Sequence, residues 1–209
     1  METKQGPILV VEDMDQIRTL LEVTLRFDGH PVESACNGVE ALEKIKETRP
    51  VLVISDILMP QMDGFAMVYN LRTNPETRDI PVVFLSATYV TREDKAFALS
   101  LGAARFLEKP IEPAEFLLTI GEVLAEGSKP LSDPLAEPAF YEGYKLRLET
   151  KLRQKNQQIE RTRSLLATLS ESQKPTFETL LAESLEHRTQ IIKELEEIIQ
   201  TLKTLENKD

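Results

Sequence analysis

The chain has 209 residues, a formal net charge of −10 and one cysteine. The negative charge argues against nucleic acid as the main partner, because phosphate binding needs a basic surface. Cys36 has no second cysteine to pair with, which excludes an internal disulfide and a cysteine-based metal site, and we expect it to be a small buried side chain. With no signal peptide and no run of roughly 20 apolar residues, we expect a cytoplasmic protein without a membrane span.

The first 126 residues alternate short β-branched runs with segments of helical period. Strands are expected at residues 8–11, 31–35, 51–55, 82–85 and 105–107. Helices are expected at residues 16–27, 38–47, 65–72, 92–101 and 113–125. Five strand–helix units predict an α/β domain, a doubly wound five-stranded parallel sheet with helices on both faces. The second strand is the least apolar and is expected at an edge of the sheet.

A change of composition predicts three segments: a domain over residues 1–126, a linker over 127–138 and a helical region over 139–209. The linker contains three prolines and a glycine, which break helices and strands. Beyond it, helices are expected at about residues 140–169 and 175–205, with apolar side chains at heptad spacing. The polar break between them ends in a proline, which favours an antiparallel helical hairpin.

Charge also separates the segments. Residues 1–138 hold 13 basic and 23 acidic residues, whereas residues 139–209 hold 12 of each. Within the hairpin the first helical half is basic and the second acidic, so the two helices attract each other. The second helix carries an extra apolar row, Leu185, Ile192 and Ile199, which a single partner helix would leave exposed to water. We therefore expect a homodimer formed through a four-helix bundle of residues 139–209.

Polar side chains follow four of the expected strands: Glu12, Asp13, Asp56, Ser86 and Lys109. In a doubly wound sheet of order 2-1-3-4-5, the strands before these residues are neighbours, and the side chains converge at the carboxyl edge. Three carboxylates so close together need a cation, and an all-oxygen set is what Mg²⁺ accepts. With the metal and a lysine neutralising a phosphoryl group, Asp56 is placed to act as a nucleophile and form an acyl phosphate.

Four motifs in order resemble the receiver domain of two-component response regulators: Val10-Val11-Glu12-Asp13, the stretch from Asp56 to Gly64, Leu85-Ser86-Ala87 and Lys109-Pro110. The resemblance covers roughly residues 6 to 126 and implies the flavodoxin-like fold, with Asp56 as the phosphoacceptor. It implies Mg²⁺ bound directly by Asp13, Asp56 and the backbone carbonyl of Leu58, with Glu12 acting through water.

The same resemblance assigns phosphoryl sensing to Ser86 and Lys109 and a cis peptide bond to Lys109-Pro110. It makes Phe106 a rotating switch aromatic, although a half-buried aromatic beside the fifth strand is equally well explained as core packing. Leu58 and Thr88 occupy positions that influence the lifetime of the phosphate. Because an apolar Leu58 does not orient an attacking water, we expect a phosphorylated state that is not unusually short-lived.

The function that this resemblance implies is a phosphorylation-dependent switch, in which a sensor histidine kinase phosphorylates Asp56 and the hairpin docks a downstream partner. The hairpin has no DNA-binding motif, and the chain is not expected to be an enzyme beyond self-phosphorylation and self-dephosphorylation. One alternative is a phosphorelay intermediate that passes phosphate to a histidine on another protein or to His187 of the hairpin. A scaffold that is never phosphorylated is another. A further alternative is an enzyme, an aspartyl phosphohydrolase. Such enzymes resembling the haloacid dehalogenase family need a second acid two residues after the nucleophile, and this chain has Leu58 there.

Overall fold

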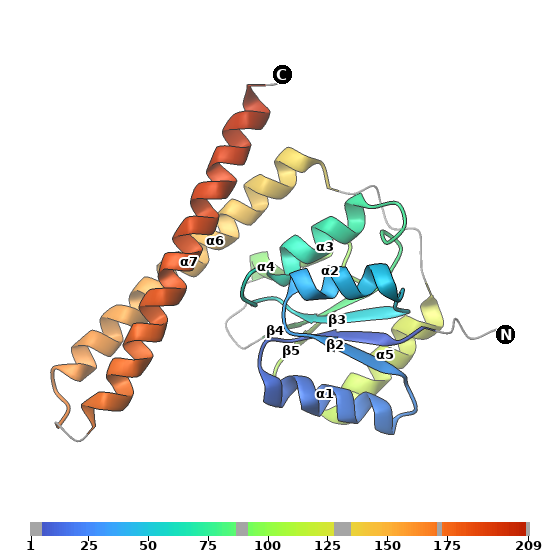
Figure 1. Cartoon of the computed structure of the whole chain (residues 1–209), viewed down its shortest axis with the longest axis horizontal. Helices are drawn as coiled ribbons and strands as arrows, with labels where there is room; N and C mark the ends of the chain where they lie inside the picture. Colours follow the sequence, from blue (N-terminus) through green and yellow to red (C-terminus); the bar gives the residue numbers. More distant parts are fainter. Residues whose placement is uncertain (1–5, 87–91, 128–134, 171–172, 208–209) are drawn as a thin grey trace. The chain divides into compact units, whose positions relative to one another are not determined.

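The computed structural model of the chain describes residues 6–86, 92–127, 135–170 and 173–207 (Figure 1). The chain divides into two compact units, Met1–Leu135 and Ala136–Asp209. We call them the sheet unit and the helical unit. Among the residues described, no helix has the length and apolar character that crossing a membrane demands.

Five parallel strands form the sheet in the order β2-β1-β3-β4-β5, so the predicted fold class and strand order are confirmed. The strands are β1 (Ile8–Val11), β2 (Val32–Ala35), β3 (Leu52–Asp56), β4 (Val82–Ser86) and β5 (Arg105–Glu108). As expected, β2 is an edge strand, and it is less buried than the central strands. The register places Asp56, the last residue of β3, opposite Leu85 of β4.

Five helices alternate with the strands, and each begins and ends close to the range predicted from helical period. They are α1 (Asp15–Phe27), α2 (Gly38–Glu47), α3 (Gly64–Thr73), α4 (Arg92–Ser100) and α5 (Pro113–Glu126). Helices α1 and α5 cover one face of the sheet, and α2, α3 and α4 cover the other (Figure 1). Their arrangement leaves the loops at the carboxyl edge of the strands free to carry a site.

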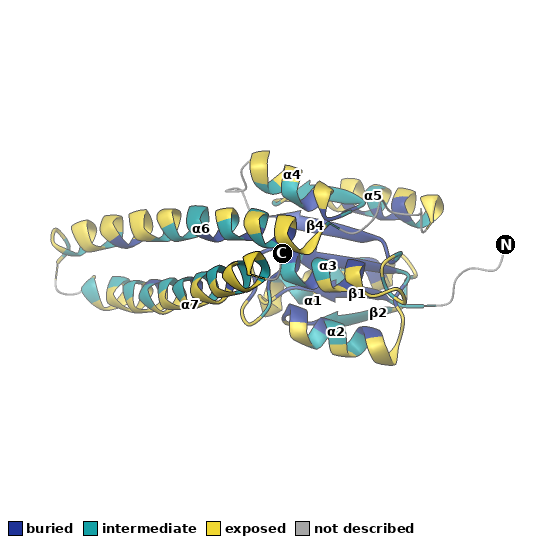
Figure 2. Ribbon diagram, turned by 90° about the horizontal axis from the view of Figure 1, so that it is seen from above, coloured by how far each residue is buried: buried dark blue, intermediate teal, exposed yellow. Residues whose placement is uncertain are grey.

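The core of the sheet unit lies between the strands and the helices on both faces. Strands β1 and β4 are buried along their whole length and β3 up to its final aspartate, because parallel strands are covered on both sides (Figure 2). Under α1 and α5, Leu25 and Ile120 pack against strand residues such as Ile54. This core fixes the strand ends, and with them the polar residues that follow.

Cys36 corrects one expectation, because it is exposed rather than buried. It lies between the end of β2 and Asn37, the residue that caps α2. The Asn37 side chain accepts a hydrogen bond from the Glu40 backbone N–H at 3.0 Å, and Glu40 in turn accepts one from the Cys36 N–H at 2.8 Å. This reciprocal capping at an edge strand, rather than the apolar character of the thiol, places residue 36 at the surface.

The helical unit consists, in its described residues, of two long helices, α6 (Glu137–Leu166) and α7 (Lys174–Glu206), which run antiparallel as predicted. Helix α6 begins and ends about one turn earlier than the expected range of 140–169. Pro138 lies in its first turn, where the fixed φ of proline suits a helix and its missing N–H costs no hydrogen bond. Reading Pro138 only as a helix breaker was therefore wrong.

Apolar rows along the two helices face each other. Ile159 of α6 and Ile191 of α7 are each 3% exposed, and Arg188 donates a hydrogen bond from Nε to Asn156 Oδ1 at 2.7 Å. The extra row of α7, formed by Leu185, Ile192 and Ile199, is only half-buried. Part of the apolar surface of α7 therefore stays in contact with water.

Candidate functional site

The candidate site lies at the carboxyl edge of the sheet, where the neighbouring strands β1, β3, β4 and β5 end. Glu12 and Asp13 follow β1, Asp56 closes β3, and Lys109 follows β5. Carboxylate oxygens of Glu12, Asp13 and Asp56 all lie within 4.8 Å of one another. The strand order expected from the sequence predicted this convergence of residues that are far apart along the chain, such as Glu12 and Lys109.

Lys109 lies directly against the carboxylate cluster. Its Nζ donates to Glu12 Oε2 at 2.6 Å and lies 3.5 Å from Asp56 Oδ2. Glu12 is fully buried, so this ion pair is largely shielded from solvent. The ammonium therefore balances part of the negative charge at the end of β3.

Burial makes ionisation of two of the three acids costly. It raises the pKa of Glu12 above its ordinary value, against the opposing hydrogen bond and charge of Lys109. It also raises the pKa of Asp56, and here too the charge of Lys109 and the hydrogen bond from the Ile57 N–H oppose the shift. A further positive charge would favour the ionised form of both groups.

The cluster fits a divalent cation, by the chemistry of its donors. Its three carboxylates outnumber the single ammonium by two, which is the charge that a divalent cation offsets. The donors are all oxygen atoms, and Asp13 is exposed, so water has access to complete an octahedral shell. The predicted ligands Glu12, Asp13 and Asp56 are therefore compatible with Mg²⁺.

Ser86 is the last residue of β4, and Lys109 follows the neighbouring strand β5. The Lys109 N–H donates a hydrogen bond to the Ser86 carbonyl at 2.6 Å. Ser86 is 1% exposed and lies one residue beyond the position paired with Asp56. The Lys109–Pro110 peptide bond is cis, as the resemblance implied. Phe106 is half-buried on β5, opposite Phe84, and the Lys95 ammonium lies 5.8 Å from the centre of its ring.

The loop from Ile57 to Asp63 returns the chain to Asp56. Gly64 donates its N–H to the Ile57 carbonyl at 2.9 Å, and Asp63 caps α3 by accepting from the Ala66 N–H at 2.9 Å. Gly64 is not there for the backbone freedom that glycine gives a turn, because its φ is not positive. The reason is close packing instead, because an added Cβ would collide with the Asp56 carbonyl oxygen.

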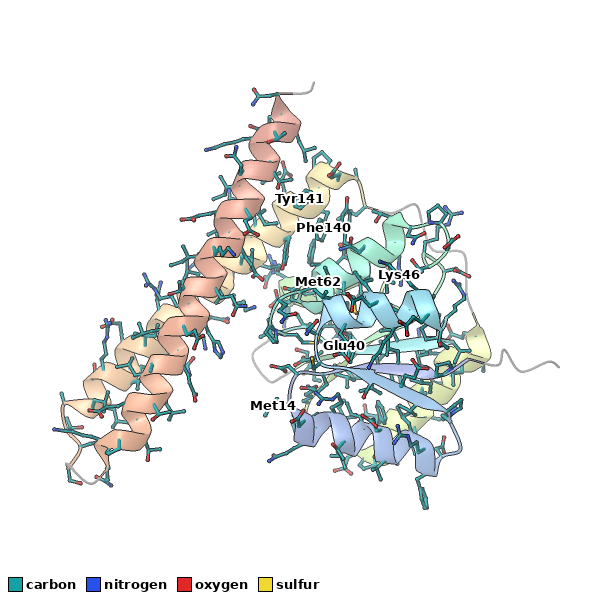
Figure 3. The ribbon with its side chains drawn as sticks, in the orientation of Figure 1. Met14, Glu40, Lys46, Met62, Phe140 and Tyr141 are labelled. Atoms are coloured by element: carbon teal, nitrogen blue, oxygen red, sulfur yellow. The ribbon has the colours of Figure 1, made fainter. Side chains whose placement is uncertain are left out.

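A neighbouring loop supports the same segment. Gly38, the first residue of α2, donates its N–H to the carbonyl of Met62 at 3.0 Å. A Cβ on Gly38 would lie 2.8 Å from Met62 Cγ and 2.9 Å from that carbonyl oxygen. Met62 is labelled in Figure 3 together with Glu40, which follows Gly38 on α2. This contact was not predicted from the sequence, because local patterns do not show which loops touch.

Of the two residues predicted to affect the lifetime of the phosphate, the structure describes one. Leu58 lies two residues beyond Asp56 in the loop and is 48% exposed, so its side chain borders the site without being buried. Thr88 lies outside the described residues. The role of each stays a prediction.

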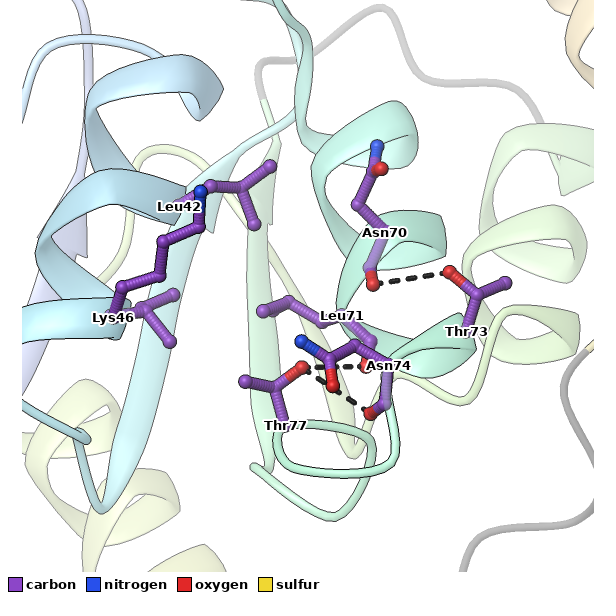
Figure 4. Close-up of a pocket in the computed structure, with 8 residues that line it drawn as sticks. Leu42, Lys46, Asn70, Leu71, Thr73, Asn74 and Thr77 are labelled. Carbon is purple, nitrogen blue, oxygen red and sulfur yellow. Dashed lines mark hydrogen bonds between the residues drawn. The ribbon is translucent and has the colours of Figure 1, made fainter.

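A pocket of about 290 Å³ lies away from the carboxylates, between α2 and α3 (Figure 4). The two threonines of its lining make hydrogen bonds within the chain. Thr77 donates to the Leu71 carbonyl at 2.9 Å, and Thr73 donates to the Tyr69 and Asn70 carbonyls. With these groups already paired, the pocket offers little to orient a ligand, and the carboxylate cluster is the stronger candidate site.

Comparison with known proteins identifies the family to which this fold and its acidic cluster belong. A family profile described as the response regulator receiver domain matches residues 8–120, more than half of the chain. The chain therefore belongs to the response regulator receiver domain family. Receiver domains are phosphorylated by histidine kinases and bind Mg²⁺, in agreement with the donor set at Glu12, Asp13 and Asp56.

Among curated relatives, "Probable transcriptional regulator ycf27" of Pyropia yezoensis is 36% identical over 129 residues, covering 62% of this chain and 51% of the relative. The chain thus spans about half the length of this relative. "Uncharacterized 14.6 kDa protein in sodA1 3'region" of Leptolyngbya boryana is 38% identical over 113 residues, covering 54% of this chain and 86% of the relative.

Two solved structures resemble the chain over the sheet unit. The receiver domain of a signal transduction histidine kinase from Syntrophus aciditrophicus has a TM-score of 0.55 and 35% identity, covering 63% of this chain and 98% of that one. Chemotaxis protein CheY4 of Vibrio cholerae has a TM-score of 0.53 and 35% identity, covering 56% of this chain and 98% of that one.

Proposed function

We propose that the chain is a phosphorylation-controlled switch whose phosphoacceptor is Asp56 and whose donor is a sensor histidine kinase. The observation that carries the proposal is the meeting of Glu12, Asp13, Asp56 and Lys109 around one point at the edge of the sheet. A carboxylate used only to cap a strand would need neither two further acids nor a buried ion pair beside it.

In the proposed reaction, a carboxylate oxygen of Asp56 attacks the phosphorus atom of a phosphohistidine. The new O–P bond forms as the bond between phosphorus and the imidazole nitrogen breaks, and the electron pair leaves with the imidazole. Lys109, 3.5 Å from Asp56, is placed to stabilise the negative charge on the phosphoryl oxygens. Mg²⁺, when held by Asp13, Asp56 and the Leu58 carbonyl, with Glu12 acting through water, supplies further charge neutralisation.

The readout that we propose begins at Ser86 and Lys109, which would hydrogen-bond to the phosphoryl group. A change of contacts at the ends of β4 and β5 then shifts a pre-existing equilibrium that includes the position of Phe106. Leu58 and Thr88 would set how long the acyl phosphate survives. The ring of Phe106 is half-buried and contacts Lys95 of α4, so a change in its position would reach that helix.

We further propose that the helical unit forms a homodimer and docks a downstream protein. The half-buried row Leu185, Ile192 and Ile199 of α7 would be covered by a second hairpin in a four-helix bundle. The ycf27 relatives are transcriptional regulators by name. We assign no DNA contact to the hairpin, because residues 170–209 hold 9 acidic and 5 basic residues and residues 139–209 contain no helix-turn-helix pattern.

The test is to incubate the full chain with acetyl phosphate and Mg²⁺ and to measure intact mass and subunit number together. The natural chain is expected to gain one phosphoryl group and Asp56→Asn to gain none. A chain lacking residues 139–209 is expected to be phosphorylated yet monomeric. Equal subunit numbers with and without these residues would contradict the dimer, and equal phosphorylation of Asp56→Asn would contradict the phosphoacceptor.

A phosphorelay is the second candidate, because His187 is exposed on α7 and is therefore accessible to a phosphorylated aspartate. Phosphohistidine is less stable in mild acid than an acyl phosphate, so the acid stability of the label separates the two. Label that survives mild acid and persists in His187→Gln would exclude transfer to the hairpin. If Asp56→Asn alters neither subunit number nor partner binding in the presence of donor, the chain acts as an unphosphorylated scaffold.

A further inference from the structure

Helix α4 (Arg92–Ser100) is weakly anchored to the sheet unit. Its one buried side chain among nine residues is Ala98, and Leu99 beside it is 50% exposed. Because burial of apolar surface is the main force that holds a helix on a sheet, a helix with so small a buried face depends on a few specific contacts. Those contacts decide where α4 lies.

One such contact joins α4 to the first turn of α3, which follows the loop that leaves Asp56. The rings of Phe97 on α4 and Phe65 on α3 meet edge to face, with centroids 5.1 Å apart and planes at 76°. Phe65 is 3% exposed and makes a second edge contact, at 5.5 Å, with Phe84 of β4. Edge-to-face pairs favour one relative orientation of the rings, so Phe65 fixes the place of Phe97.

Phe65 is also tied directly to the phosphoacceptor. It follows Gly64, whose N–H bonds the Ile57 carbonyl and whose Cα lies too close to the Asp56 carbonyl for a Cβ to fit. A shift of the backbone at Asp56 therefore reaches Phe65 through covalent bonds and close packing, and reaches α4 through one ring contact. On its other side, α4 meets the proposed switch aromatic Phe106 through Lys95.

We propose that Phe97 is a positioning residue of the switch: its ring, held edge to face against Phe65, keeps α4 in the unphosphorylated arrangement. This rests on the proposed function of Asp56, and it gives α4 a second connection to the site, besides the one through Phe106. Losing an aromatic pair of this kind shifts a two-state equilibrium by about twofold to tenfold. By linkage, a variant that releases α4 also favours phosphorylation by a similar factor.

The test compares Phe97→Leu with Phe97→Tyr in the full chain, by amide hydrogen exchange without donor and by phosphorylation with acetyl phosphate and Mg²⁺. Phe97→Leu keeps an apolar side chain but loses the ring, and it is expected to speed exchange of the α4 amides about twofold to tenfold while the β1 and β3 amides keep their rates. It should also raise the phosphorylated fraction. Phe97→Tyr keeps the ring and should restore both values. Phe27→Leu, at a ring that is 92% exposed on α1, is the matched control and should change neither.

Two results would overturn this role while leaving Asp56 as phosphoacceptor. One is unchanged α4 exchange in Phe97→Leu, and the other is faster exchange spread evenly over the strands, which would indicate a general loss of stability. Failure of the proposed function looks different, because neither the natural chain nor any variant would then gain phosphate. Faster α4 exchange in Phe65→Leu, with no further increase in the double variant, would support the ring pair as the cause.

Discussion

Gly64→Ala tests whether close packing of the loop positions Asp56. The substitution adds one methyl group at the start of α3, where the new Cβ would collide with the Asp56 carbonyl oxygen. The same atom would lie 2.9 Å from Phe84 Cε1 and 3.2 Å from Ile57 Cα, both shorter than an ordinary contact of 3.4–4 Å. None of these atoms belongs to a flexible side chain end, so the backbone at Asp56 has to move.

The expected damage has two parts. Forcing a methyl group into a packed interior costs about 1–3 kcal/mol of unfolding free energy. Relief of the clash needs the strand end to shift by roughly 1 Å, and a misplacement of that size slows a positioned reaction about 100-fold. Denaturant unfolding measures the first effect, and the rate of phosphorylation by acetyl phosphate with Mg²⁺ measures the second.

Gly121→Ala is the matched control, because Gly121 lies inside α5 and a Cβ there meets nothing within 4 Å. Replacing a glycine in a helix interior by alanine is expected to stabilise the chain by about 0.5–1 kcal/mol and to leave phosphorylation unchanged. If Gly64→Ala matched the natural chain in both stability and rate, the packing argument for Asp56 would be refuted.

Three further substitutions are informative. Hydrogen bonds from Cys36 and then Lys44 hold the pKa of the Glu40 carboxyl at about 2. Because the folded chain favours the ionised carboxylate, Glu40→Gln should lower the unfolding free energy by about 1 kcal/mol above pH 4.5, after solvent screening, and this difference should disappear as the pH falls toward 2. A difference that does not change with pH would contradict this role. Ile159→Ala should cost about 2–5 kcal/mol on thermal unfolding of the hairpin, unlike a substitution at an exposed site. Lys109→Gln should slow phosphorylation about 100-fold or more, and a rate near that of the natural chain would exclude Lys109 from the site.

The sheet and its site followed from simple regularities of the sequence. Five apolar runs separated by helical segments predicted the parallel sheet, and the rule that such sheets carry their sites at the carboxyl edge brought Glu12, Asp56 and Lys109 together. The rule works because the direction of each strand fixes which end its last residue occupies. Burial and charge at that edge then follow from the fold.

Other features depended on contacts that no local pattern reveals. Cys36 is exposed because capping of α2 holds it in an edge turn, although the residue type favours burial. Gly64 is needed for an approach to a carbonyl eight residues away in sequence, and Phe97 meets a ring on another helix. Pro138 reads equally well as a breaker or as the first turn of a helix, and only the backbone distinguishes the two.

The most direct test of the account is to identify the residue that carries phosphate. The full chain is treated with acetyl phosphate and Mg²⁺, the acyl phosphate is trapped by borohydride reduction, and the modified peptide is sequenced by mass spectrometry. The account predicts that the modified side chain is Asp56 and that omission of Mg²⁺ abolishes the signal. Modification at a different residue, or equal modification without a divalent cation, would contradict it.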